Sequence, residues 1–548
     1  MDSSSDHSEK QKHAGNVVVD VVDIDVAAAL ASSNVRLDSE AAAKLRRKVD
    51  WHLMPLMCIM YLMTFADKTT LGQAAVLGLL PGAHLNQNQF NWLGSIFYFS
   101  YLLFEVRAAF TSPGNPIKTR VPPVPTKSRT ILRCKRSTDP NLLLQALQRF
   151  PVGKWMSVNI FVWAIALMAH AACKSFGALF AVRFILGLCE GAITPGFMIV
   201  TAMFYTREEQ NKRVGYWFLM NGFAVIFLGF VAFGVLHTET PDFMPWQWLF
   251  MITGIITLIT SILFWFFFPD SPTTARFLTT EERVLAVERI KVNQAGVENK
   301  HWKRSQFIAT IKDPKIWLLA AFAAFSNIIN SLIVQRQIIV KMFGFNSIQT
   351  TLLGCVDGVV EILTIWAGVT LAGYKPIGRA YAGIIMFIPA ILGSILVNTL
   401  PSHNKVGLLF SYWLTIFAIT PFAISLGWLS SLTAGHTRRT TANAIMLVAY
   451  GLGNAVGPFM WKAQYQPRNH VPWGIITGCT VVSAILLLVI RYVYAAENKR
   501  RAVAKESGNF DEYYISEVQP DGTIIEKKID REFLDLTDIE NKEFRYVL

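Results

Sequence analysis

The sequence is poor in charged residues: only 16% of its 548 residues are Asp, Glu, Lys or Arg, whereas 52% are hydrophobic. A soluble globule of this length would need more polar surface, so the composition excludes that class and indicates a membrane protein. Cysteine is also scarce. Five of the six cysteines lie in or beside apolar runs, so neither a disulfide framework nor a zinc-ligand spacing is present.

Recognisable catalytic patterns are missing as well. The histidines are scattered without metal-ligand spacing, and no catalytic triad is evident. The close-spaced glycines of "GLGNAVGP", Gly451 to Pro458, follow no strand, so helix packing explains them better than a dinucleotide-binding loop does. We therefore expect no enzymatic activity, no cofactor and no metal.

The net charge of +13 does not indicate nucleic-acid binding, because Lys and Arg do not cluster in one domain. They lie between the apolar runs, in alternate gaps. The N-terminus has no short cleavable apolar segment, so the first long apolar helix is expected to serve as an uncleaved signal anchor.

Long apolar runs dominate the rest of the chain. A helical membrane crossing needs roughly 20 apolar residues, and twelve segments qualify. They are approximately 53–78, 89–105, 155–173, 176–203, 214–236, 248–268, 315–342, 350–372, 380–398, 406–429, 441–461 and 473–494. The sequence thus predicts an all-α membrane protein with twelve transmembrane helices in two six-helix halves.

The predicted halves are residues 51–268, with an insertion at 106–148, and residues 315–494. A cytosolic loop, 269–314, joins them. Within it, Thr279 and Glu282 have the spacing of a capping box that opens an amphipathic helix. The polar tails, 1–50 and 495–548, show no apolar periodicity that would indicate further folded domains.

The distribution of Lys and Arg predicts the orientation. These residues are concentrated in the gaps after even-numbered helices and are few in the gaps after odd-numbered ones. Because cytosolic loops carry the excess of positive charge, both termini are expected in the cytosol.

An internal repeat supports the division into halves. "PVGK", Pro151 to Lys154, precedes the third helix, and "PIGR", Pro376 to Arg379, precedes the ninth. Arg213 and Arg439 occupy nearly the same place before the fifth and eleventh helices. Parallel six-helix repeats of this kind are used by transporters that alternate access around a central site.

Two charged residues of the fourth segment are candidates for function. In "RFILGLCEGAITPGF", Arg183 and Glu190 lie seven residues apart and so share one helix face. A charge at the bilayer centre costs at least ~2.5–3.5 kcal/mol, so Glu190 must face water, meet a cation or be protonated. We expect Glu190 to carry a coupled proton and Arg183 to hold an anion or Glu190 itself; a purely structural ion pair is the alternative.

Further intramembrane charges lie in the first, seventh and eighth segments. Asp67 and Lys68 are adjacent, point about 100° apart on a helix, and should each find a partner elsewhere in the bundle. A functional role would pair Asp67 with a proton or a basic residue and Lys68 with the substrate anion, whereas snorkelling to water is the structural alternative. Arg336 is a substrate-binding candidate. Asp357 and Glu361, four residues apart, could partner Arg336 or Lys341, structurally or functionally.

Two polar residues of the eleventh segment complete the candidates. Tyr450 and Asn454 lie one turn apart and could hydrogen-bond either substrate or neighbouring helices.

Four stretches carry a resemblance to a known family. They are "LRRKVDWHLMPLMCIMYLMTFADKTTLGQA", "RFILGLCEGAITPGFM", "FPDSPTTARFLTTEERVLAVERI" and "AGHTRRTTANAIMLVAYGLGNAVGPFMWKAQYQP". The chain resembles, from about residue 45 to 500, the allantoate permease branch of the fungal anion:cation symporters, in the major facilitator superfamily.

The resemblance implies a plasma-membrane carrier that imports a small carboxylate, such as allantoate, nicotinate, pantothenate or another vitamin, together with protons. It assigns coupling and anion binding to the acid-base pair Asp67 and Lys68 and to Arg183 with Glu190. The expected partners are the carboxylate, protons and the lipid bilayer, with no nucleic acid, and the protein is expected to be a monomer. A nutrient sensor without transport, or a carrier for a different solute class, is the alternative.

Two departures from the family pattern stand out. The family passes from the second to the third helix through a short loop, whereas this chain has the insertion 106–148, which is either translated intron or a genuine cytosolic loop. The seventh helix reads "NSLIVQRQIIVKMFGF", where the family has a stretch rich in small residues and Asn. Arg336 in that position would alter specificity, unless this segment reflects an error in the gene model.

Overall fold

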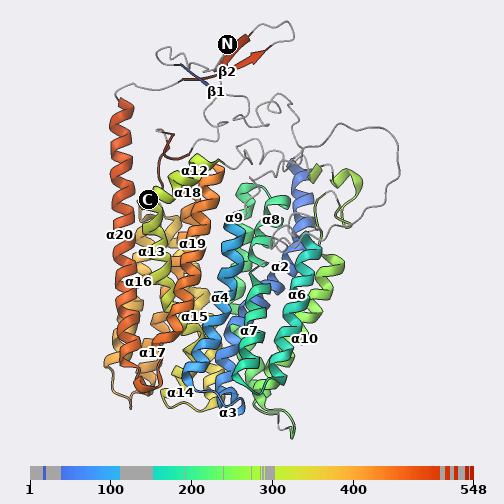
Figure 1. The fold of residues 1–548 in the computed structure, drawn as a ribbon, viewed down its shortest axis with the longest axis vertical. Helices are drawn as coiled ribbons and strands as arrows, with labels where there is room; N and C mark the ends of the chain where they lie inside the picture. The colour runs from blue at the N-terminus through green and yellow to red at the C-terminus, as the bar shows by residue number, and fades with distance from the viewer. Residues whose placement is uncertain are drawn as a thin grey trace, which may run out of the picture.

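A computed structural model gives the fold (Figure 1). It describes residues 16–19, 39–110, 152–191, 193–238, 240–272, 274–283, 285–286, 289, 303–374, 376–506, 512–518, 524–528, 537–541 and 544–548. Long helices run side by side through the bundle, and the first and second halves of the chain occupy opposite sides of it.

The first half consists of helices that follow the predicted segments closely. They are α2 (Ser39–Val76), the short α3 (Leu79–Gly82), α4 (Gln87–Phe110), α6 (Val152–Ala169), α7 (Phe176–Glu190), α8 (Ile193–Phe204), α9 (Arg207–Val235) and α10 (Pro245–Phe267). We call this set the N-half.

The second half begins after a short connecting helix, α12 (Arg304–Lys312). Its helices are α13 (Pro314–Ile328), α14 (Leu332–Met342), α15 (Ser347–Gly373), α16 (Gly378–Thr399), α17 (Lys405–Thr415), α18 (Thr420–Leu432), α19 (His436–Val456) and α20 (His470–Glu506). We call this set the C-half. The helix α20 continues past residue 494, where the bundle was expected to end.

Within the described part of the chain, nine helical spans are long and apolar enough to cross a membrane. The other three predicted segments form α4, the pair α7 and α8, and α19, which lie within the same bundle. The all-α fold in two six-helix halves is therefore confirmed.

Three predicted crossings are interrupted. The fourth stops at Glu190 and resumes at Ile193, the seventh passes through a 3₁₀ turn at Ile329–Ser331, and the tenth through Ile416–Ile419. Proline explains two of these breaks, because Pro195 and Pro421 have no amide hydrogen to donate to the preceding turn. Interrupted helices near the middle of a membrane are typical of transporter binding sites.

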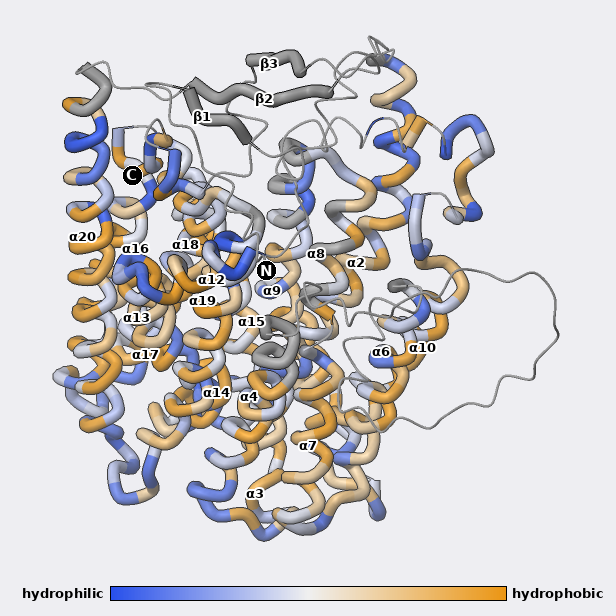
Figure 2. The backbone as a smooth tube through the Cα atoms, turned by 45° about the horizontal axis from the view of Figure 1, so that its top comes forward, coloured by the Kyte–Doolittle hydropathy of each residue, from blue (hydrophilic) through white to orange (hydrophobic). Residues whose placement is uncertain are grey.

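The outer surface of the bundle is apolar. Phe230, Phe266, Trp366 and Ile388 are each more than half exposed, which would be costly in water but suits contact with lipid. Figure 2 shows hydrophobic residues along the helices and hydrophilic segments at both ends of the bundle. The surface thus matches a membrane-embedded protein.

The end of the bundle that carries the start of α2 and the end of α20, here called the terminal end, is rich in ion pairs. In the N-half, Arg213 donates to Asp50 at 2.7 Å, and Lys48 lies 2.7 Å from Glu282. Glu282 also accepts from the backbone of Thr279, which donates at 2.8 Å, so the predicted capping box is confirmed. The loop after α10 is thereby tied back onto the N-half.

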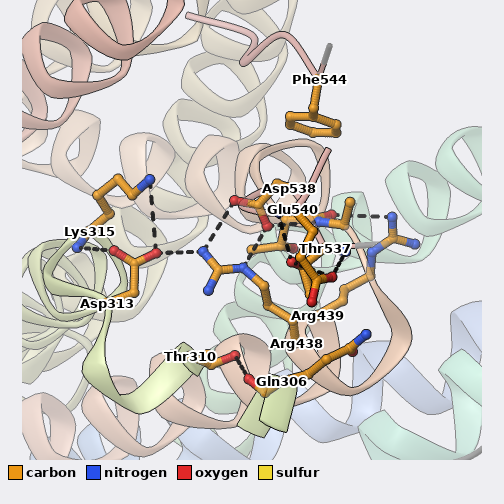
Figure 3. A network of polar contacts seen from close by, with 12 residues as sticks. Gln306, Thr310, Asp313, Lys315, Arg438, Arg439, Thr537, Asp538, Glu540 and Phe544 are labelled. Carbon is orange, nitrogen blue, oxygen red and sulfur yellow. Dashed lines mark hydrogen bonds and ion pairs between the residues drawn. The ribbon is translucent and has the colours of Figure 1, made fainter. Parts of the chain in front are cut away.

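A corresponding segment, residues 537–541 and 544–548, ties the terminal end of the C-half (Figure 3); we call it the C-terminal strap. Arg438 of α19 bridges Asp313, at the start of α13, and Asp538 of the strap. Trp428 donates to the carbonyl of Val547 at 2.7 Å. The C-terminal tail, for which no further folded domain was expected, thus contributes contacts to the C-half through this segment.

The "PVGK" and "PIGR" motifs make similar backbone contacts in the two halves. The backbone N–H of Lys154 donates to Asp270 at 3.2 Å, and that of Arg379 donates to the backbone oxygen of Leu548 at 3.1 Å. The counterpart of Arg213 is Arg438, not Arg439 as predicted, since Arg438 follows Pro376 by the same number of residues as Arg213 follows Pro151.

The two tails also meet outside the bundle. The strand β1 (Asn16–Val19) pairs in parallel with β2 (Glu512–Val518), which pairs antiparallel with β3 (Ile524–Lys528). No periodicity in the tails predicted these strands.

Part of the insertion 106–148 falls on described residues. The helix α4 continues to Phe110, so the insertion begins as an extension of the second predicted helix. Residues 111–151 lie outside the described residues.

Candidate functional site

The intramembrane charges of the N-half form two ion pairs between α2 and α7. Lys68 Nζ lies 2.8 Å from Glu190 Oε1, and Arg183 Nη1 lies 3.8 Å from Asp67 Oδ1. Asp67, Arg183 and Glu190 are almost fully buried, whereas the Lys68 side chain is 18% exposed. We call these four residues the N-half site.

Helix geometry explains this pairing. Successive residues on α2 point about 100° apart, so Asp67 and Lys68 reach different partners, as predicted. Arg183 and Glu190 lie two turns apart on one face of α7, which brings each opposite one member of the adjacent pair. Glu190 meets Lys68 and Arg183 meets Asp67, so the alternative in which Arg183 holds Glu190 does not describe this structure.

The Arg183–Asp67 pair leaves some of its hydrogen-bonding atoms without a partner. Trp163 of α6 donates its indole N–H to Asp67 Oδ2 at 3.0 Å, and Arg183 lies over the ring of Phe250, 5.8 Å from its centroid. The Nε and Nη2 atoms of Arg183 are buried without a hydrogen-bond partner. Buried donors without a partner are costly, and these two give the N-half site capacity to bind an additional acceptor, such as a carboxylate.

Three tyrosines contribute to the electrostatic environment of Lys68. Tyr61, Tyr98 and Tyr450 all lie within electrostatic range of it, contributed by α2, α4 and α19. The Tyr450 ring is 6.4 Å from that of Tyr98 and stacks on Phe422 at 5.2 Å. Tyr450, a predicted substrate ligand, is therefore placed by the C-half beside the N-half site.

Asn454 lies in a different environment. Its side-chain amide donates to the carbonyl of Tyr450 at 2.9 Å and to Asn327 of α13 at 3.4 Å. Asn327 in turn accepts from Asn330 at 2.8 Å. These contacts all lie within the C-half, so the structure does not bring Asn454 together with the N-half charges.

Arg336 belongs to a second buried group, in the C-half. Its Nη2 atom lies 3.7 Å from Glu361 Oε2. Asp357, one turn before Glu361 on α15, accepts from Trp413 Nε1 at 2.8 Å and from the Tyr412 hydroxyl at 3.2 Å. Of the two partners predicted for these carboxylates, Arg336 is the one found, and Lys341 is exposed near the end of α14.

One set of contacts between the halves lies at the end opposite the terminal end, here called the far end. Asn91 of α4 donates to the carbonyl of Trp461 at 2.6 Å and accepts from Gln335 of α14 at 2.9 Å. A Cβ on Gly72 of α2 would lie 2.6 Å from the carbonyl oxygen of Val334, so the two backbones touch. The halves are therefore held together at the far end of the bundle.

Sequence reasoning missed three residues that complete these groups. Trp163, Trp413 and Tyr412 each donate to a buried carboxylate. Aromatic residues are common in apolar helices, so only the fold reveals which of their polar atoms face a charge. Among the described residues, no group of three or more His, Cys, Asp and Glu side chains could hold a metal.

Comparison with known proteins places the chain among membrane carriers. The model of the Major Facilitator Superfamily matches residues 142–458. The chain is 32% identical to the thiamine pathway transporter THI73 of Saccharomyces cerevisiae, over 93% of this chain and 87% of that protein. It is 31% identical to the allantoate permease of the same yeast, over 97% and 91%.

Solved structures show a similar fold. The xylose transporter XylE from E. coli, in a partially occluded inward-open conformation, superposes with a TM-score of 0.58, covering 80% of this chain and 97% of that one at 13% identity. A bacterial homologue of the lysosomal transporter Spinster, in an inward-facing conformation, gives a TM-score of 0.54, covering 83% and 96% at 13% identity.

Proposed function

Because this chain belongs to the major facilitator superfamily, among the fungal transporters related to allantoate permease, we propose that it imports a small organic anion together with protons. It is not an enzyme: its relatives are transporters and permeases. The finer statements, namely the anion, the coupled proton and the residues that bind them, constitute the proposal.

The observation that supports it best is the Lys68–Glu190 ion pair. The two groups lie 2.8 Å apart in the interior of the bundle, and Lys68 alone of the four N-half charges is appreciably exposed. While Glu190 is ionised it competes with any other anion for Lys68. Protonation of Glu190 removes that competition and leaves an ammonium ready for a carboxylate.

The same exchange couples the two ligands. An anion bound to Lys68 stabilises the protonated form of Glu190. When Glu190 is protonated, the bound anion does not compete with a second carboxylate for the ammonium. By linkage, a proton on Glu190 raises the affinity for the anion by the same factor by which the bound anion raises the affinity for the proton. Arg183, with two unpartnered donors, provides a second contact for the carboxylate, and Tyr450 a hydrogen bond from the other half. Asp67 balances the charge of Arg183 and is the second proposed proton carrier.

Alternating access follows from where the halves touch. Contacts such as Asn91 with Trp461 hold the halves together at the far end, and we propose that in this conformation substrate exchanges at the terminal end. We place the terminal end, and with it both chain termini, in the cytosol, in accord with the excess of Lys and Arg in those loops. Rocking of the two halves about the site would break the far-end contacts and open the site to the extracellular side.

The solute is proposed to be a carboxylate such as allantoate, nicotinate or pantothenate, because the two N-half cations suit an anion. Relatives named for allantoate and for high-affinity cysteine transport show that this group includes carriers of different solutes. We propose a monomer in the plasma membrane.

Uptake measurements test the proposal. Cells that lack their own permeases would express the protein and receive a panel of labelled carboxylates at two external pH values, with and without a protonophore. Accumulation that rises at the lower pH and collapses with the protonophore supports a proton symporter. Binding without accumulation would instead identify a nutrient sensor, and uptake that ignores both pH and protonophore would contradict proton coupling.

A further inference from the structure

The interior charges of the C-half do not balance. In the described helices, the N-half site holds two acids and two bases, whereas the C-half group holds two carboxylates, Asp357 and Glu361, and one cation, Arg336. All three C-half side chains are nearly or fully buried. An uncompensated charge in a membrane interior is costly, and this group lacks one unit of positive charge.

The two carboxylates differ in their surroundings. Asp357 accepts hydrogen bonds from Trp413 and Tyr412, and donors of this kind stabilise the ionised form of a carboxylate. Both oxygens of Glu361 are buried without a hydrogen-bond partner, and Arg336 approaches no closer than an ion pair at 3.7 Å. Glu361 is thus the carboxylate whose ionised form is less stabilised by its surroundings.

No other cation among the described residues packs against Glu361. On α9, the residues that meet α15 near Gly358 are Gly222 and Ile226. On α16 and α18, the residues that meet it at Gly368 are Met386 and Thr420. The titratable groups around Glu361 are Arg336 of α14, Asp357 of its own helix, Tyr412 of α17 and, at longer range, Tyr61 of α2. Neither tyrosine supplies positive charge.

We propose that Glu361 is a second proton-binding site, in the C-half, that controls whether Arg336 is available to the transported anion. A proton on Glu361 neutralises the surplus carboxylate and leaves Arg336 with no ionised partner at its 3.7 Å contact. Arg336 can then bind an anion. When the proton leaves, Glu361 takes Arg336 back and the anion is released.

This inference rests on the proposed anion transport and adds to it a prediction of stoichiometry. Each half would carry one carboxylate that competes with the substrate for a cation: Glu190 for Lys68 and Glu361 for Arg336. The C-half would then add one proton per anion to those carried by the N-half site.

Infrared spectroscopy tests protonation directly, without a known substrate. The purified full-length protein in lipid would be examined by pH-difference infrared spectroscopy, in which a protonated carboxyl group has a carbonyl band separate from that of a carboxylate. Exposed Asp and Glu are ionised above about pH 5, so bands that change between neutral and mildly acidic pH report perturbed carboxyls. We expect a band that is absent in Glu361→Gln and retained in Glu190→Gln. In Asp357→Asn the surplus negative charge is gone, so the band should appear only at a lower pH.

Two further variants keep the test decisive if Glu361→Gln is hard to interpret. Arg336→Met removes the cation that pairs with Glu361, so the Glu361 proton should be held over the whole pH range and its band should no longer respond to pH. Glu281→Gln, at an exposed position, should leave the spectrum unchanged. A spectrum that is identical in the unmodified protein, Glu361→Gln and Arg336→Met would overturn the proposal and would instead favour a site for a cationic group of the solute.

Failure of the proposed function is distinguishable from failure of this inference. If the protein accumulates no carboxylate but the Glu361 band is present, the C-half proton site stands and the anion symport does not. If carboxylate accumulates with pH while the band is missing, only the second site is wrong.

Discussion

The Glu190 carboxylate lies 2.8 Å from the ammonium of Lys68, which reaches it from a different helix. A side chain that is 2% exposed is thereby paired with one that is 18% exposed. The buried carboxylate is therefore linked, through its partner, to the more accessible edge of the site. The first prediction follows from this arrangement.

Glu190→Gln should uncouple transport from the proton gradient. Glutamine cannot take up a proton and does not hold Lys68 by charge, so the anion still binds but no longer requires acidity. We expect pH-driven accumulation to fall to the level seen with a protonophore, while exchange of labelled for unlabelled anion persists.

The matched control is Glu281→Gln, the same chemical change at an exposed position of the terminal end, which should transport normally. Unchanged pH-driven accumulation by Glu190→Gln would remove this residue from the coupling mechanism.

Trp163→Phe should loosen the N-half site. The substitution keeps the aromatic ring but removes the indole N–H that donates to Asp67 Oδ2 at 3.0 Å. Interhelical hydrogen bonds in membrane proteins are worth about 0.6 kcal/mol on average and up to about 1.7 kcal/mol, so the thermal midpoint in detergent should fall modestly. Trp366→Phe, at a position 65% exposed toward the lipid, should leave it unchanged. Equal midpoints for the two variants would show that the bond contributes nothing.

The C-terminal strap should stabilise the C-half through Arg438. This arginine bridges Asp313 and Asp538, so replacing either aspartate by asparagine leaves it with one charged partner, and replacing both leaves it buried with none. We expect the double variant to lose more stability than the sum of the single variants, with an interaction energy of about 0.5–3 kcal/mol. Unfolding of the purified protein, followed for all three variants, measures it. Strict additivity would mean that Arg438 does not couple the strap to α13.

Acidification should weaken the terminal end of the N-half through Glu209. Burial raises the pKa of this carboxyl, but the hydrogen bond from the backbone of Thr206 and the contact with Arg289 outweigh burial and hold the pKa below its ordinary value of 4.5. A carboxyl whose pKa is lowered in the folded state contributes stability above its ordinary pKa, and that stability is lost as pH falls through the folded-state value.

Glu209→Gln should therefore be less stable than the unmodified protein at pH 7, and the gap between them should narrow as pH falls below about 4.5. Thermal midpoints measured across this range provide the comparison, with Glu281→Gln as the control. A gap that stays constant with pH would assign the effect of the substitution to the lost helix cap rather than to charge.

Apolar length and charge distribution were enough to predict much of the architecture. Twelve runs near the length of a membrane crossing, and the "PVGK" and "PIGR" repeats, predicted two six-helix halves. This works because the bilayer interior tolerates only helices whose backbone groups are satisfied internally, so hydrophobicity alone marks the spans. The candidate charges could be found in the same way, because an ionisable residue within such a run is rare.

The pairing of those charges was decided by tertiary structure alone. One helix places Asp67 and Lys68 on different faces, but which residue of α7 each meets depends on how two helices are rotated and shifted against each other. The same holds for Arg438, rather than its neighbour Arg439, as the partner of Asp313. It also holds for the strap, whose contacts include that of Val547 with Trp428, 119 positions earlier. Hydrophobic periodicity carries no information on such contacts, because they are set by the packing of helices that are distant in sequence.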